Sequence, residues 1–128
     1  MKGHWVGVVG IVVLLSAGAA WSHEEHHAAA PGGGQVLTGE VVDVFCYLSH
    51  GKDGLGKGHA GCAKKCISSG LPVALKVGDQ LYLATMASHE SANKTLAQWA
   101  GQQVTVHGTV MEADGQHLIA ITKVEKHE

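Results

Sequence analysis

The amino-acid sequence predicts a mainly β fold with short helices, arranged as a small five-stranded barrel. Three observations support this. Five apolar segments have the Val-rich or alternating pattern of strands, Gly-Asp and Asp-Gly turns join two pairs of them, and a helical pattern separates the third strand from the fourth. This order of elements is the one expected of an OB-like barrel, here with a Cys- and His-bearing helix after strand 1.

The first half of the barrel begins with a Val-rich strand predicted over 36–48, in which Gly39 marks a bulge. A glycine-rich loop, 49–58, follows. Residues 59–69 then have the pattern of a short helix, and Gly70 is placed to cap its C-terminus. We therefore expect this helix to start soon after the first strand ends.

The second half consists of two predicted hairpins separated by a second helix. The first hairpin covers 72–86, and the helix covers 91–100 with Ser91 as its N-cap. The last hairpin lies within 104–124, where apolar and polar residues alternate on either side of the Asp114-Gly115 turn. These segments supply strands two to five.

The N-terminal segment, residues 1–22, has the layout of a secretory signal peptide. A short positive region precedes a Val-rich apolar run, and small residues at its end suit a signal peptidase. A retained membrane anchor is the alternative, but a bilayer span needs about 20 apolar residues and this run is shorter. We therefore predict a periplasmic or secreted protein without stable membrane insertion after cleavage, with a His-rich flexible linker over 23–35 and one domain over 36–128.

Composition argues against several classes of function. The chain has no arginine, and the segment after residue 22 has eight lysines against eleven acidic residues, a formal charge of −3. Nucleic acid is a poor partner for such a chain, because a basic surface and bidentate guanidinium groups are missing. No Ser, His and acid spacing or paired carboxylates stand out, so no enzyme is predicted.

The chemistry of the domain is concentrated in three cysteines and a histidine. His59, Cys62 and Cys66 form an H-x2-C-x3-C pattern that places all three on one face of the predicted helix. If that helix packs across the end of the first strand, Cys46 completes a Cys3His set suited to zinc or copper. His50, four residues after Cys46, is a further candidate that could replace His59 or support the other ligands.

Other uses of these cysteines remain open from the sequence. An oxidising compartment favours a disulfide from Cys46 to Cys62 or Cys66 with one free thiol, as in a stapled adaptor domain that binds another protein. A thiol/disulfide redox protein is a second alternative, and non-covalent haem ligation a third. The helical spacing of Cys62 and Cys66 favours metal, because side chains four apart lie about 5–6 Å apart at Cβ and a disulfide prefers about 3.8 Å.

A second candidate metal site lies in the His-rich tip. Cleavage after Ser22 would expose the amine of His23, with His26 and His27 close by. Imidazole ligands suit Cu(II), Ni(II) and Zn(II), so this tail could collect ions and deliver them to the thiolates. The alternative is a solvated leader without a ligand role.

The runs GEVVDVFCYLSHG and GHAGCAKKCISSGLPVAL, followed by LYLAT and VTVHGTV, carry a family resemblance. The chain resembles a family of small exported bacterial proteins of largely uncharacterised function over about residues 36–124. The matching positions are Cys46, Tyr47, His59, Cys62, Cys66, Gly70 and Pro72. The resemblance implies an OB-type barrel with a shared metal site. For a metal-binding protein that stores, senses or transfers its ion, we expect a metal ion and a periplasmic or membrane protein as partners.

Overall fold

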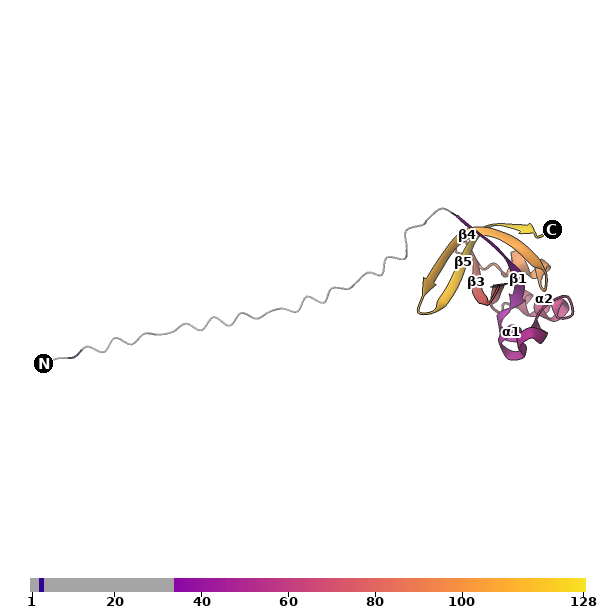
Figure 1. The fold of residues 1–128 in the computed structure, drawn as a ribbon, viewed down its shortest axis with the longest axis horizontal. Helices are drawn as coiled ribbons and strands as arrows, with labels where there is room; N and C mark the ends of the chain where they lie inside the picture. The colour runs from indigo at the N-terminus through magenta and orange to yellow at the C-terminus, as the bar shows by residue number, and fades with distance from the viewer. Residues whose placement is uncertain (1–2, 4–33) are drawn as a thin grey trace.

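The chain folds into a closed five-stranded barrel with short helices, as the sequence predicts. A computed structural model describes residue 3 and residues 34–128. The strands follow one another around the barrel in the order β1-β2-β3-β5-β4. Figure 1 labels four of them, β1, β3, β4 and β5. Their bounds are β1 (Gln35–Asp43), β2 (Val73–Val77), β3 (Gln80–Met86), β4 (Gln103–Ala113) and β5 (Gln116–Lys126).

Closure of the barrel depends on β1 and on one parallel pairing. β1 is antiparallel to both β2 and β4, and β3 pairs in parallel with β5. Both predicted hairpins are present, β2–β3 and β4–β5. The turn of the second contains Asp114 and Gly115 at φ 50° and 75°, the left-handed conformation that a two-residue hairpin loop requires.

The prediction of a bulge at Gly39 is wrong. Gly39 pairs with Val104 of β4 in an unbroken register. Its missing side chain allows close approach instead, because a Cβ there would lie 2.6 Å from the carbonyl oxygen of Lys76. The irregularity falls between His107 and Gly108 on β4, where a Cβ on Gly108 would overlap the carbonyl of Ala120. The two glycines thus let strands bend tightly at different points.

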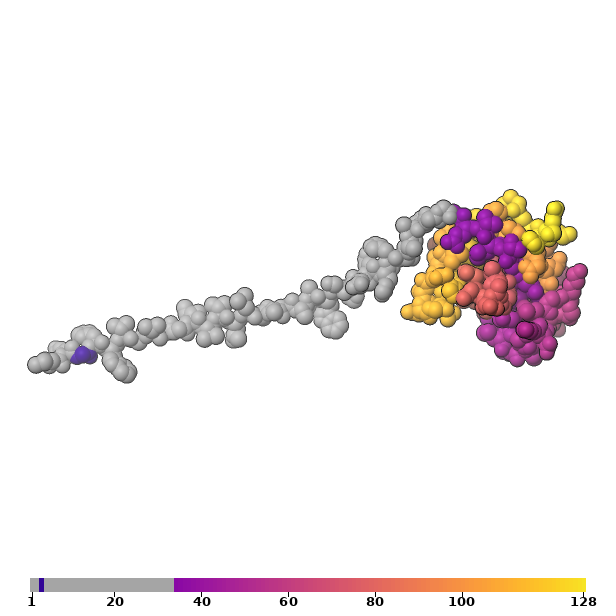
Figure 2. Space-filling model, viewed as in Figure 1, coloured from indigo at the N-terminus to yellow at the C-terminus, as the bar shows by residue number. Residues whose placement is uncertain are grey.

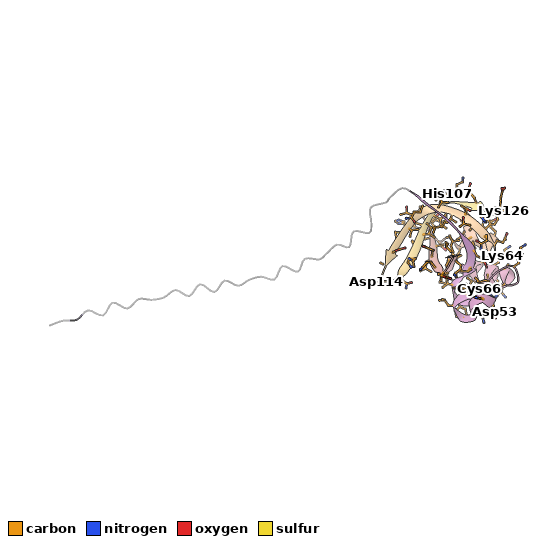
Figure 3. All side chains as sticks on the ribbon, in the orientation of Figure 1. Asp53, Lys64, Cys66, His107, Asp114 and Lys126 are labelled. Atoms are coloured by element: carbon orange, nitrogen blue, oxygen red, sulfur yellow. The ribbon has the colours of Figure 1, made fainter. Side chains whose placement is uncertain are left out.

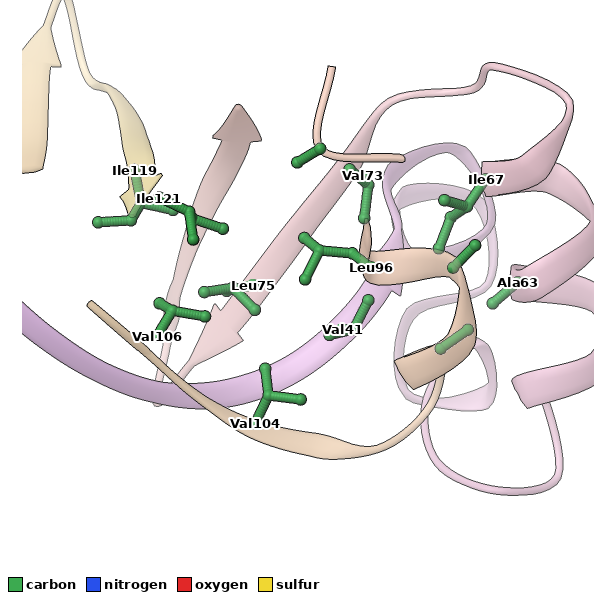
Figure 4. Close-up of a cluster of buried hydrophobic side chains, with 13 residues drawn as sticks. Val41, Ala63, Ile67, Val73, Leu75, Leu96, Val104, Val106, Ile119 and Ile121 are labelled. Carbon is green, nitrogen blue, oxygen red and sulfur yellow. The ribbon is translucent and has the colours of Figure 1, made fainter. Parts of the chain in front are cut away.

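The hydrophobic core runs from the barrel interior to the helices that cover one end. In Figure 4 side chains from the strands converge on one another, while Leu96, Ile67 and Ala63 continue the cluster outward from the helices. All of these residues are at most 2% exposed. The strand residues in the centre are Val41, Leu75, Val104, Val106, Ile119 and Ile121.

The helical segments are α1 (Val44–His50), η1 (Gly51–Gly54), α2 (Ala60–Ser68), α3 (Asn93–Leu96) and η2 (Ala97–Trp99). The prediction of a strand over 36–48 is wrong beyond Asp43, because the chain turns there into α1. The helix predicted over 59–69 is confirmed as α2 within a residue at each end. The helix predicted over 91–100 is present as α3 and η2, but its N-cap residue is Ala92 and not Ser91. Ser91 Oγ still accepts a hydrogen bond from the Asn93 amide at 3.2 Å.

The helices α1 and α2 lie together at one end of the barrel, magenta in Figures 1 and 2. Among the described residues, no helix combines the length and the apolar character that crossing a bilayer requires. The predicted signal segment, apart from residue 3, and the tail histidines His23, His26 and His27 lie outside the described residues.

Candidate metal centre

Asp43 ends β1 and begins α1. It has an extended backbone, and its Oδ1 accepts a hydrogen bond from the Cys46 amide at 2.7 Å. Aspartate is a favoured residue at this N-cap position, because its side chain satisfies an amide that has no partner within the helix. The Val44 amide also donates to the Pro72 carbonyl at 3.0 Å, which ties the start of α1 to the residue before β2. Cys46 is therefore held in the first turn of a helix, and its prediction at a strand end is wrong.

The other two cysteines are positioned by α2. His59 is the N-cap residue of this helix, and Cys62 and Cys66 follow on successive turns. The helix ends as predicted at Gly70, whose φ is 98°. The Gly70 amide donates to the Ile67 carbonyl at 3.0 Å and the Leu71 amide to the Cys66 carbonyl at 3.1 Å, which is the Schellman arrangement.

Two overlapping groups of ligand atoms result, and both include Cys46. In the first, the Sγ atoms of Cys46 and Cys62 and a ring nitrogen of His59 all lie within 4.8 Å of one another. In the second, Cys46 Sγ, Cys66 Sγ and a carboxylate oxygen of Asp43 lie within the same limit. Cys66 is labelled in Figure 3, on the helical end of the molecule and far from Asp114 at the tip of the β4–β5 hairpin.

The predicted ligands are thus gathered at one place, although not as a single set. Among the described residues, no group contains Cys46, His59, Cys62 and Cys66 together within this limit. His50 belongs to neither group. Its ring centre lies 6.4 Å from that of His59, and its side chain is exposed.

Burial differs among the ligand atoms. Cys46 is 5% exposed and Asp43 only 1%, whereas Cys62 is exposed and Cys66 half-buried. Of the three buried side-chain polar atoms without a hydrogen-bond partner among the described residues, two belong to these ligand residues, Asp43 Oδ2 and His59 Nε2. A buried polar atom without a partner is costly, so each is suited to a ligand that is not part of the chain.

The three cysteines are free, and no disulfide joins them. The Asp43 carboxylate and, after it, burial raise the pKa of Cys46 from 9.0 to about 12. Burial is the main cause that raises the pKa of the Cys66 thiol, and Asp43 adds to it. Both thiols therefore hold their protons at neutral pH until a cation replaces them.

Asp43 is the site residue that the sequence analysis missed. The available signal was its position three residues before Cys46, the spacing of an N-cap aspartate and the amide that it caps. Two histidines on the strands contact acidic side chains away from this site: His107 Nε2 lies 2.8 Å from Glu125 Oε2, and His117 Nδ1 lies 2.9 Å from Glu112 Oε1.

Comparison with known proteins adds no assignment. No protein-family model, curated protein or solved structure matches the chain. The functional argument therefore depends on the geometry of the cysteines, His59 and Asp43.

Proposed function

We propose that this is an exported metal-binding protein, which uses its cysteines and His59 to hold copper or zinc for storage, sensing or transfer in the periplasm. The observation that carries the proposal is the clustering of Cys46, His59 and Cys62, whose ligand atoms lie within 4.8 Å of one another. Ligand sulfurs around a tetrahedral zinc are about 3.8 Å apart, given Zn–S bonds of about 2.3 Å. A modest contraction would therefore close this group around an ion.

The chemistry of the group supports a soft or borderline metal. Thiolates and imidazole are the ligands that zinc and Cu(I) prefer. His59 lies beside the two thiols, and its Nε2 is buried without a hydrogen-bond partner, which a metal ion would supply. A cation also offsets the unfavourable ionisation of Cys46, since metal binding and thiol deprotonation are coupled.

A thiol redox function is less well supported. A nucleophilic cysteine needs a lowered pKa, whereas the pKa values of Cys46 and Cys66 are both raised. The exposure of Cys62 favours transfer of a bound metal ion to a partner protein, because a ligand from the partner can approach the ion from that side. We therefore include a periplasmic or membrane partner protein in the proposal.

Metal titration of the reduced protein, followed by native mass spectrometry and competition with a chelator, tests this function. The variants His59→Ala and Cys62→Ser should each lose at least 10-fold in affinity for zinc or Cu(I). Two exposed positions serve as matched controls, His127→Ala for the imidazole and Ser68→Ala for the α2 surface. Unchanged affinity in both site variants would contradict the proposed ligands, and no bound zinc or copper in the parent protein would contradict the function.

A further inference from the structure

We infer that the site holds two zinc ions side by side, bridged by the thiolate of Cys46, with Asp43 as a ligand of the second ion. The inference deepens the proposed function. It starts from the two ligand groups, which share one atom, Cys46 Sγ. One ion would be bound by Cys46, Cys62 and His59, and the other by Cys46, Cys66 and Asp43.

A single ion does not account for all of these atoms. A structural zinc takes four ligands, and five side chains converge here. His59 and Cys66 are not brought into one group within the limit that each trio satisfies. A thiolate sulfur has enough lone pairs to bind two cations, and metal ions that share ligands in proteins lie about 3.5–4 Å apart. Two ions that share Cys46 would each have three protein ligands, and water or a ligand from a partner would fill the fourth position of each.

Each trio also contains its own unsatisfied buried atom. His59, whose buried Nε2 has no hydrogen-bond partner, belongs to the first trio, and Asp43, whose buried Oδ2 has none, belongs to the second. Asp43 is 1% exposed, and none of the ion pairs among the described residues involves it. The capping bond to the Cys46 amide uses only Oδ1. A buried carboxylate with a free oxygen beside two thiols lacks a counter-charge, which a cation would supply.

Charge balance favours two divalent ions. With the three thiols and Asp43 ionised and His59 neutral, the ligands carry four negative charges, which two Zn²⁺ ions neutralise. One Zn²⁺ bound by Cys46, Cys62 and His59 would leave the buried Asp43 carboxylate without a cation, a costly arrangement. The carboxylate further favours zinc over Cu(I), because oxygen ligands suit the harder ion.

Native mass spectrometry with zinc tests the inference on the mature chain in which His23, His26 and His27 are replaced by alanine, so that the tail binds no ion. We expect two zinc ions per chain in this background. Asp43→Asn, Cys66→Ser and Cys62→Ser should each retain one, and Cys46→Ser should retain none. Asparagine is also a good N-cap residue, so Asp43→Asn preserves the start of α1.

Cadmium-113 NMR of the same background separates bridged ions from independent ones. Two signals with a mutual scalar coupling that disappears in Cys66→Ser are the expected result. If the chain without tail histidines binds a single zinc, and Asp43→Asn binds that zinc as tightly, the second ion on Cys46, Cys66 and Asp43 is overturned. The proposed function is left intact by that result. No zinc or copper in the background would overturn the proposed function itself.

Discussion

The reactivity of Cys46 toward iodoacetamide tests the electrostatics of the metal-free site. Asp43 and burial raise its pKa from 9.0 to about 12. At pH 8 the thiolate fraction therefore falls from about one in ten to about one in ten thousand. A more basic thiolate is also more nucleophilic. With a Brønsted coefficient of about 0.4–0.5, the rate constant of the thiolate rises by a factor of about 15–30, which offsets part of this loss. We expect native Cys46 to react about 30- to 60-fold more slowly than in the unfolded chain, before its burial slows it further.

The assay is a time course with chelator and reductant present, in which each cysteine is quantified by peptide mass spectrometry and compared with the same cysteine in guanidinium chloride. Burial alone would also slow the reaction, so Asp43→Asn provides the decisive comparison. Removal of the negative charge should accelerate alkylation of Cys46, whereas Asp53→Asn, an exposed acid in η1, should not. An unchanged rate in Asp43→Asn would refute the electrostatic explanation.

Three further predictions concern the fold. Leu75→Ala, at a position with 0% exposure in the barrel centre, should lower the free energy of unfolding by about 2–5 kcal/mol in a urea titration. Gly108→Ala should cost about 1–3 kcal/mol in the same assay, because its Cβ overlaps the neighbouring strand. Lys123 and, after it, His107 lower the pKa of Glu125 below 4.5, so its stabilisation exists above the unfolded-state pKa and is lost as pH falls through the folded-state value. Glu125→Gln should therefore flatten the acid side of a plot of thermal midpoint against pH, and an unaltered curve would argue against this ion pair.

Local patterns in the sequence predicted the barrel because they agree with the tertiary fold. Alternating residues in 104–110 place Val104 and Val106 in the core, where both are 0% exposed. Gly70 and Gly115 adopt the left-handed conformations that their positions require. Where propensity, periodicity and turn chemistry point the same way, an element can be predicted from a short window of sequence.

The same reasoning failed at α1 because two local signals compete there. Val44, Phe45 and Tyr47 favour a strand by propensity, and the prediction followed them without considering Asp43 as a helix cap. In the structure, the capping bond and the contact of the Val44 amide with Pro72 stabilise a helix. The second of these joins residues far apart in sequence, so no local window could have contained it.

The helical start of α1 determines which side chains can meet at the site. On a strand, Asp43 and Cys46 would point to opposite faces, because they are three positions apart and side chains alternate along the chain. The N-cap geometry instead places Asp43 next to the thiols of Cys46 and Cys66, with one carboxylate oxygen used by the helix and the other unpartnered. Asp43 therefore both starts α1 and adds a hard carboxylate ligand to a site otherwise made of soft thiolates and an imidazole. This double role explains why Asp43→Asn is the most informative substitution: it keeps the helix start and removes only the charge.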